Sequence, residues 1–281
     1  MGRQTWRWVR KAPLKYEEAW RERLSFLPPD RLVIHGKPGG KTVRLEAYAD
    51  RPDDLRTMAA VFGGKVEKFD PDDIVRQAGA PRRPLRIAKV LGVIDAHGKW
   101  PDSATRPRVV LRIGSAMAFG TGEHATTAAC LRFLADEARA LPEGWSCLDL
   151  GAGSGILAIA AEKLGAGVVR GFDYDPRAVR AARANVTLNH CRRVTITAKN
   201  LLVWKPGCRR YRVVMANVFS ETLRAAAASI VRAVAPQGCL VLSGILRPQE
   251  RDVLRTFRPL GLALETASRR GKWVTLLLRA S

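Results

Sequence analysis

The sequence predicts an α/β protein with a doubly wound, mostly parallel sheet in its larger C-terminal part and a small α+β unit before it. Three observations predict this fold class. Strand and helix patterns alternate from about residue 145 onward, which is typical of a parallel sheet covered on both faces. The last two predicted strands, 262–266 and 273–278, have no helix between them and should close the sheet as an antiparallel pair. Residues 4–70 instead follow the order strand, helix, strand, strand, helix, strand of a ferredoxin-like domain.

The elements of the small unit follow from short sequence patterns. Trp20 and Leu24 lie on one side of the first helix, which stops before two consecutive prolines. Apolar and polar residues alternate over 43–49, as expected for a half-buried strand. Asp53 is expected to cap the second helix, and two glycines follow the end of that helix. The predicted strands are 6–9, 32–34, 43–49 and 66–69, and the predicted helices are 16–26 and 53–62.

Prolines interrupt the next segment, residues 71–108, which predicts a connector with one strand over 85–94. We therefore expect a small domain at 1–70, a linker at 71–112 and the larger domain at 113–281.

The boundaries of helices and strands are easier to predict in the larger domain. Asp175 and Pro176 are a capping residue and a first helical residue in sequence, so a helix should start there. A further helix from about Ala128 leads into the first strand of the sheet. The predicted strands are 145–150, 168–172, 194–197, 213–218, 240–245, 262–266 and 273–278, and the predicted helices between them are 156–164, 176–189, 221–234 and 248–257.

Composition excludes several classes of protein. The 281 residues carry 48 Lys and Arg against 26 Asp and Glu, a net charge of +22, while 47% of them are hydrophobic, too many for a disordered basic tail. The charge favours either a nucleic-acid partner or a generally basic surface. The five cysteines include no CxxC pair, so neither a disulfide framework nor a metal site is expected. No apolar run reaches the roughly 18–20 residues of a membrane span, and no secretory signal is evident, so a cytoplasmic protein without membrane contact is the default.

The strongest motif is the run DLGAGSG, which starts at Asp149 and lies between a predicted strand and a predicted helix. Glycines there allow a tight turn and close approach of a ligand to the helix N-terminus. A dinucleotide fingerprint would need its third glycine at position 156, which is Ile156. Asp173 ends the next strand, where a carboxylate can accept both ribose hydroxyls of an adenosine ligand. This form of the loop favours S-adenosylmethionine over a dinucleotide.

Two further segments are ambiguous by themselves. In AFGTGEHATT, the polar residues either serve a site or simply begin a helix, with Thr126 as its cap. In MANVFS, Asn217 follows the fourth strand of the large sheet, where open α/β sheets bind ligands. Alternatively, Asn217 or Ser220 caps the helix that follows.

Together these segments resemble the bacterial methyltransferases of large-subunit ribosomal protein eleven. The resemblance rests on AFGTGEHATT, LDLGAGSGILAIAAEKLGA, GFDYDPRAVRAARANVTLN, VMANVFSETL and LSGIL, in family order over about residues 113–250. It implies a class I methyltransferase fold with a terminal antiparallel strand, and a ferredoxin-like domain that recognises the substrate. The implied cofactor residues are Phe119, Gly120, Thr127, Asp149, Gly151, Gly153, Asp173 and Asn217.

The resemblance also implies individual roles. Gly151 and Gly153 contact the methionine part of the cofactor, Asp173 binds the ribose, and Thr127 closes over the cofactor. Asn217 lies beside the sulfonium and the incoming amine, and Phe119 and Gly120 line the site. Asn200 is a candidate for the adenine side, and Glu123 and His124 are candidate bases.

Departures from the family pattern affect the acceptor side. Glu123 and Ala125 stand where the family often has Thr and Pro, and Val218-Phe219-Ser220 follows Asn217 in place of the usual residues. The expected function is methyl transfer to lysine or N-terminal amines of a ribosomal protein, by a monomer that contacts rRNA through its basic surface. The alternatives are methylation of RNA or another protein, although no NPPY-type acceptor motif is present at Asn217, and a non-catalytic cofactor-binding assembly factor.

Overall fold

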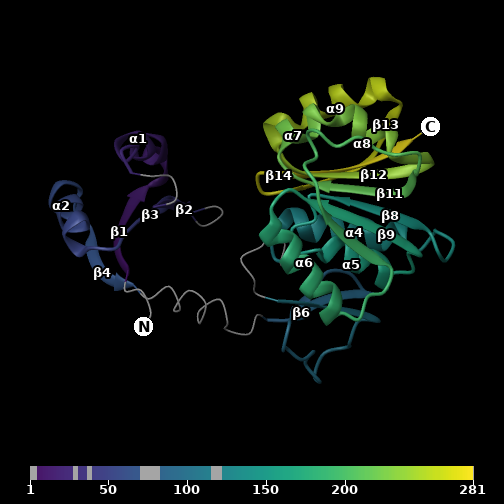
Figure 1. Cartoon of the computed structure of the whole chain (residues 1–281), viewed down its shortest axis with the longest axis horizontal. Helices are drawn as coiled ribbons and strands as arrows, with labels where there is room; N and C mark the ends of the chain where they lie inside the picture. Colours follow the sequence, from purple (N-terminus) through teal and green to yellow (C-terminus); the bar gives the residue numbers. More distant parts are fainter. Residues whose placement is uncertain (1–4, 28–30, 37–39, 70–82, 115–121, 281) are drawn as a thin grey trace. The chain divides into compact units, whose positions relative to one another are not determined.

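The computed structural model describes residues 5–27, 31–36, 40–69, 83–114 and 122–280 (Figure 1). The chain divides into two compact units, Met1–Ala80 and Pro81–Ser281. Each unit has a hydrophobic core of its own.

The small unit has the predicted ferredoxin-like topology. Its sheet has the order β2-β3-β1-β4, and all neighbouring strands are antiparallel. Trp8, Trp20 and Leu24 form part of its core, so the predicted apolar side of the first helix is confirmed. Its elements are β1 (Thr5–Pro13), η1 (Leu14–Tyr16), α1 (Glu17–Arg23), β2 (Leu32–Gly36), β3 (Thr42–Ala49), α2 (Pro52–Phe62) and β4 (Lys65–Phe69).

The prediction that Asp53 caps α2 is wrong. Arg51 is the N-cap residue, its side chain makes no capping hydrogen bond, and Pro52 is the first helical residue. Proline prefers that position because it lacks an N–H to satisfy and its φ suits a helix, so the helix begins earlier than the acidic residue suggests.

The large unit contains the predicted seven-stranded sheet, in the order β10-β9-β8-β11-β12-β14-β13. The five strands from β10 to β12 are parallel, whereas β14 pairs antiparallel with both β12 and β13. The strands are β8 (Ser146–Leu150), β9 (Val168–Asp173), β10 (Val194–Ala198), β11 (Tyr211–Asn217), β12 (Val234–Leu246), β13 (Leu262–Arg270) and β14 (Trp273–Ala280).

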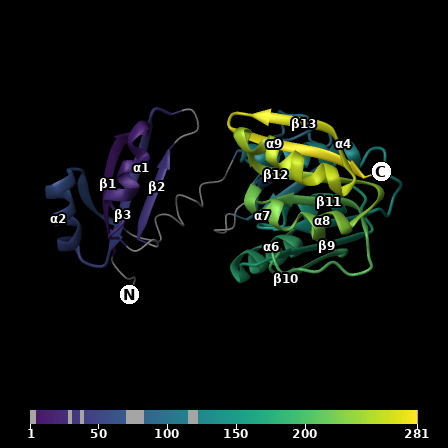
Figure 2. The ribbon, with the colours of Figure 1, turned by 90° about the horizontal axis from the view of Figure 1, so that it is seen from above.

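Helices cover both faces of this sheet (Figures 1 and 2). One face packs against α4, α5 and α6, and the other packs against α7, α8 and α9. Asp175 accepts a hydrogen bond from the Arg177 backbone at the start of α6, which confirms the predicted cap and leading proline. The helices are α4 (Ala125–Glu137), α5 (Ile156–Lys163), α6 (Pro176–Leu188), α7 (Ser220–Ala225), α8 (Ala227–Arg232) and α9 (Glu250–Phe257), with 3-10 turns η2 (Arg247–Gln249) and η3 (Arg258–Leu260).

Part of the predicted linker belongs to the large unit instead. β5 (Leu85–Arg86), β6 (Leu91–Asp95) and β7 (Val109–Ile113) form a separate sheet in the order β5-β6-β7. Their apolar side chains join the same hydrophobic core as α4, α5 and α6. The strand predicted over 85–94 is therefore two antiparallel strands, and the linker prediction is wrong from residue 85 onward. The prolines interrupt regular structure there without preventing the intervening apolar residues from packing.

The helix predicted over 221–234 is also wrong in its length. Two short helices, α7 and α8, replace it, and Val234 already starts β12. The alanine-rich sequence of this segment does not distinguish one long helix from two short ones, because alanine fits both arrangements.

Candidate active site

The glycine motif forms a loop between the end of β8 and the start of α5. Gly151, Gly153 and Gly155 all have positive φ angles, of 72°, 54° and 78°. A Cβ atom at Gly151 would lie 2.4 Å from Cγ1 of Val218. The loop therefore requires glycine both for its backbone conformation and for its close packing, and it presents backbone N–H groups at the N-terminus of α5.

Asp173, at the end of β9, is tied directly to this loop. Its Oδ2 accepts a hydrogen bond from the Gly153 backbone N–H at 2.9 Å, and its Oδ1 accepts one from the Asp175 backbone N–H at 3.0 Å. The side chain is buried. Each carboxylate oxygen still has a second lone pair with which to accept a hydroxyl. The carboxylate and the loop therefore form one rigid edge suited to a ribose.

Asp149 lies in β8, two residues before Gly151, and is 1% exposed. Its Oδ2 accepts a hydrogen bond from the Ala158 backbone N–H at 3.1 Å, whereas its Oδ1 has no partner among the described residues. Burial raises the pKa of Asp149 to about 7, and the negative charge of Asp173 adds to that rise. A buried acceptor without a donor is costly unless a ligand supplies one, so this atom fits a site for a cationic or hydrogen-bonding group.

The structure brings Thr127 and Asn217 together, although 90 positions separate them in sequence. Asn217 is the last residue of β11, and its Nδ2 donates a hydrogen bond to Oγ1 of Thr127 at 3.4 Å. Thr127 lies in the first turn of α4 and is buried. Two residues assigned to the site by different motifs thus meet beside the glycine loop, beyond the carboxyl ends of β8 and β11.

His124 caps α4, so the expectation that Thr126 does so is wrong. The His124 side chain accepts from the Thr126 backbone N–H, and its Nδ1 lies 2.7 Å from Oγ1 of Thr126. The imidazole packs edge-on against Trp273, with ring centroids 5.1 Å apart. Burial, and then the charge of Lys272, lower the pKa of His124. Both effects favour the neutral form of the ring.

The other predicted site residues are less constrained. Glu123 is exposed, and Phe119 and Gly120 lie outside the described residues. Asn200 is exposed, and its Oδ1 accepts a hydrogen bond from the Leu202 backbone N–H at 3.0 Å, which shapes the loop after β10. The capping alternative for Asn217 and Ser220 is wrong, because Phe219 occupies the N-cap position of α7 and no side chain caps it.

Two supporting contacts were not predicted from the sequence. Gly244 has a φ of 81°, and a Cβ atom there would lie 2.3 Å from the carbonyl oxygen of Val218. Val218 is thus held between Gly151 and Gly244, which fixes the strand end that carries Asn217. The LSGIL segment contains Gly244, but its contact with Val218 depends on the pairing of β11 with β12.

Asn185 is the second unpredicted contact. Its buried Nδ2 donates to the Ser154 carbonyl at 2.9 Å, and its Oδ1 accepts from the Gly114 backbone N–H at 3.0 Å. This amide joins α6 to both the glycine loop and Gly114, the residue that directly follows β7.

Within the described parts of the chain, no cluster of three or more His, Cys, Asp or Glu residues could hold a metal. All five cysteines are free.

A sheet with this strand order, a glycine loop after β8 and a carboxylate at the end of β9 defines a class I S-adenosylmethionine-dependent methyltransferase. The family model described as ribosomal protein L11 methyltransferase (PrmA) matches residues 42–281. The chain belongs to this family, and its cofactor is S-adenosylmethionine.

Individual relatives agree with this assignment. The chain is 42% identical over 264 residues to a ribosomal protein L11 methyltransferase of Dechloromonas aromatica, covering 88% of this chain and 85% of the relative. It is 39% identical over 241 residues to that of Thiobacillus denitrificans, covering 84% and 77%. The crystal structure of a ribosomal protein L11 methylase from Lactobacillus delbrueckii subsp. bulgaricus has the same fold, with a TM-score of 0.63, 24% identity, and coverage of 71% of this chain and all of that one.

Proposed function

We propose that this enzyme transfers the methyl group of S-adenosylmethionine to amine nitrogens of ribosomal protein L11, on lysine side chains, on the N-terminus or on both. The contact between Asn217 and Thr127 carries the proposal, because it places an amide beside the glycine loop at the open edge of the sheet. The names of the relatives supply the substrate. The ferredoxin-like unit is proposed to recognise that substrate, and residues 113–281 to bind the cofactor.

The observed contacts fit the cofactor. The loop at Gly151 and Gly153 accommodates its methionine part, and the carboxylate of Asp173 accepts its ribose hydroxyls. Oδ1 of Asp149, which lies two residues before Gly151, is buried without a partner among the described residues, and the bound ligand is proposed to supply its donor. Thr127 is proposed to close over the cofactor, while Phe119 and Gly120 line the site and Asn200 serves the adenine side. Bound S-adenosylmethionine would supply an electrophilic methyl group on a positively charged sulfur.

The acceptor amine must be neutral to react. A lysine has a pKa near 10.4, so its neutral form at pH 7 costs about 4.5 kcal/mol, and desolvation beside a cation supplies part of this. Asn217 is proposed to orient the neutral amine. His124 is a candidate base because its lowered pKa favours the neutral ring, and Glu123 is a second candidate because it is the exposed neighbour of His124.

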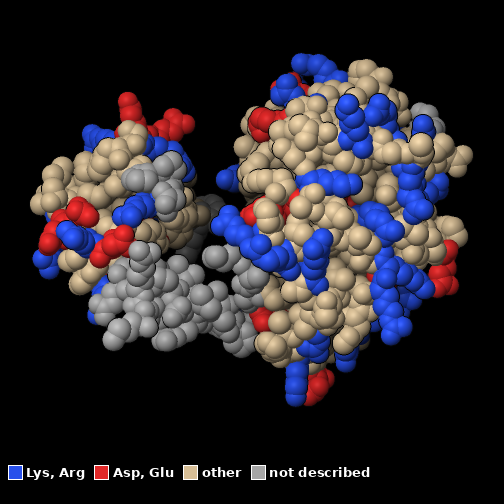
Figure 3. Space-filling view, in the orientation of Figure 1, with Lys and Arg blue, Asp and Glu red and all other residues tan. Residues whose placement is uncertain are grey.

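We further propose that the enzyme acts as a cytoplasmic monomer and contacts rRNA when its substrate is part of a ribosomal particle. Within the described part of the chain, no helix is long and apolar enough to cross a membrane. Lys and Arg outnumber Asp and Glu on the visible face of the large unit (Figure 3), which favours contact with a polyanion.

A labelling experiment tests these proposals. The protein is incubated with radiolabelled S-adenosylmethionine and, in separate reactions, free L11, whole ribosomal particles and protein-free rRNA. We expect label in L11. Label in rRNA alone would assign the enzyme to RNA methylation instead, which its basic surface would also suit. Cofactor binding without label in any substrate would indicate a non-catalytic assembly factor.

A further inference from the structure

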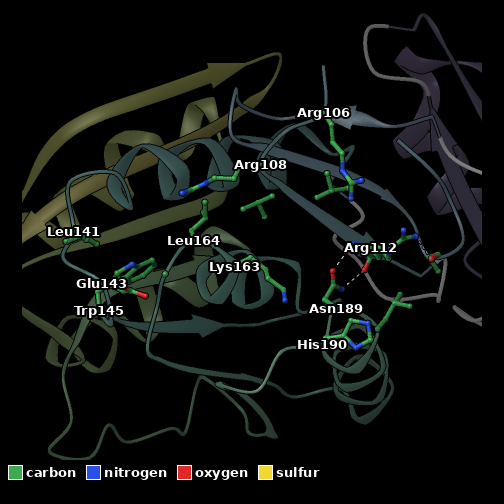
Figure 4. A pocket seen from close by; sticks show the side chains of 15 residues that line it. Arg106, Arg108, Arg112, Leu141, Glu143, Trp145, Lys163, Leu164, Asn189 and His190 are labelled. Atoms are coloured by element: carbon green, nitrogen blue, oxygen red, sulfur yellow. Dashed lines mark hydrogen bonds between the residues drawn. The ribbon is translucent and has the colours of Figure 1, made fainter. Parts of the chain in front are cut away.

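A basic groove lies on the large unit, at the edge of the sheet opposite the glycine loop. It has a cavity volume of about 1000 Å³ and is bounded by β7, the segment before β8 and the ends of α5 and α6 (Figure 4). Trp145 lines this groove and precedes β8, whereas Gly151 follows β8. A ligand in the groove would therefore leave the cofactor and acceptor positions open.

The charge of the groove is strongly positive. Its lining includes Arg106, Arg108, Arg112 and Lys163, against the single carboxylate of Glu143. Arg112 is used structurally, because its guanidinium donates to the backbone carbonyls of Ala96 and Gly98.

Three of these cations remain available. Arg106, Arg108 and Lys163 have no hydrogen bond or ion pair to any described residue, and the side chains of Arg106 and Lys163 extend into the groove in Figure 4. Unpaired cations around one cavity raise its positive potential, and arginine guanidinium groups suit phosphate oxygens in particular.

A buried donor supports the presence of a ligand. Trp145 is 6% exposed, and its Nε1 has no acceptor among the described residues. Buried N–H groups nearly always have a partner. The ideal Cβ position of Gly165, which also lines the groove, lies 3.8 Å from this nitrogen, so the unpartnered donor lies in the wall of the groove.

The helix ends do not oppose an anion strongly. The C-terminus of a helix carries partial negative charge, but the last carbonyls of α5 accept hydrogen bonds from the backbone N–H groups of Leu164, Gly165 and Ala166. The positive charge of Lys163 at the same helix end offsets the partial negative charge that remains.

We propose that this groove binds the phosphate backbone of RNA and provides the rRNA contact of the proposed function. A groove lined by three unpaired cations suits a polyanion better than a small neutral metabolite. The rings in the described lining are those of Trp145, whose burial prevents stacking on a base, and His190, so contacts from arginine and lysine to phosphate outnumber possible stacking contacts. Binding is therefore independent of base sequence and sensitive to salt.

The test is fluorescence anisotropy with a labelled oligouridine and an oligoadenine of equal length, from 50 to 300 mM salt. The full chain is compared with a triple variant, Arg106→Glu, Arg108→Glu and Lys163→Glu. A matched control, Arg232→Glu, Arg251→Glu and Arg258→Glu, makes the same charge change at exposed positions on or next to α8 and α9. Thermal unfolding and methylation of free L11 verify that both variants are folded.

We expect the groove variant to bind both oligonucleotides at least tenfold more weakly than the parent at 100 mM salt, and the control to stay within threefold. Three lost phosphate contacts should also reduce the slope of log K against log salt by about 2, at roughly 0.7 per contact for single strands. Equal losses of affinity in both variants would refute the groove as the binding site but not the proposed rRNA contact. If the parent chain shows no salt-dependent binding, both the groove proposal and the rRNA contact are refuted. Equal affinity of the groove for polyglutamate would assign it to acidic proteins instead.

Discussion

Replacing Gly244 with alanine should damage the active site, whereas the same change at Gly261 should not. Both glycines have left-handed backbone angles, with φ of 81° and 86°. A Cβ atom at position 244 would lie 2.3 Å from the carbonyl oxygen of Val218 and 2.8 Å from its carbonyl carbon, but one at position 261 would meet nothing within 4 Å. The pair therefore separates the cost of the backbone conformation from the cost of the steric clash.

The magnitudes follow from these distances. The left-handed conformation costs an alanine about 1–2 kcal/mol at either position. At position 244 the clash involves backbone atoms, so the end of β11 must move, which adds about 1–3 kcal/mol by analogy with overpacked cores. Asn217 directly precedes Val218, and a displacement of about 1 Å in a positioning group can reduce a rate about 100-fold.

Two measurements test this reasoning. Urea unfolding followed by circular dichroism should show the free energy of unfolding lowered by about 1–2 kcal/mol in Gly261→Ala and by about 2–5 kcal/mol in Gly244→Ala. Methyl transfer to L11 should fall about 10- to 100-fold in Gly244→Ala and stay near the parent rate in Gly261→Ala. If the two variants lose equal stability and retain equal rates, Val218 can move without displacing Asn217, and the packing argument is refuted.

Three further predictions concern carboxylates and the histidine of the site. Asp173→Ala should weaken cofactor binding about 100- to 10,000-fold in calorimetry, since the two charge-assisted hydrogen bonds to the ribose hydroxyls contribute about 1.5–3 kcal/mol each; unchanged affinity would remove the ribose assignment. The pKa of Asp149 is about 7 in the folded state and 3.8 as the reference, so the folded protein keeps a proton that the unfolded chain releases. Stability of the cofactor-free enzyme should therefore fall as pH rises from about 4 to about 7, by up to about 4 kcal/mol. Asp149→Asn should flatten that dependence in unfolding experiments across this range, and an unchanged slope would contradict it. His124→Asn keeps a capping side chain but no base, so activity near the parent level, with a loss only in His124→Ala, would assign His124 to capping; loss in both variants would favour a role as base.

The sequence was informative wherever a local pattern had a single physical solution. The glycine spacing after Asp149, the capping pair Asp175 and Pro176, and the helix-free ending of the chain each predicted a feature that the structure confirms. The errors occurred where local patterns compete. Pro52 displaced Asp53 from the cap of α2, and His124 displaced Thr126 from that of α4.

Burial in a distant core was the second source of error. Residues 85–112 look like a connector because prolines divide them, yet their short apolar stretches form β5, β6 and β7 and join the core of α4, α5 and α6. Nothing in the sequence around these residues indicates which helices they pack against. The basic groove beside β7 was unpredictable for the same reason, because its cations come from segments about 55 residues apart.

The sequence by itself determined the fold class, the glycine loop and its acidic partner at the end of the next strand. These depend on residues close in sequence, whose backbone conformation and burial pattern are set locally. Only the tertiary structure decided that Asn217 meets Thr127, that Val218 is held between Gly151 and Gly244, and that Asp149 retains an unpartnered oxygen. Such contacts depend on how strands pair and helices pack across the sheet, and that register is set by the whole core and by no single segment.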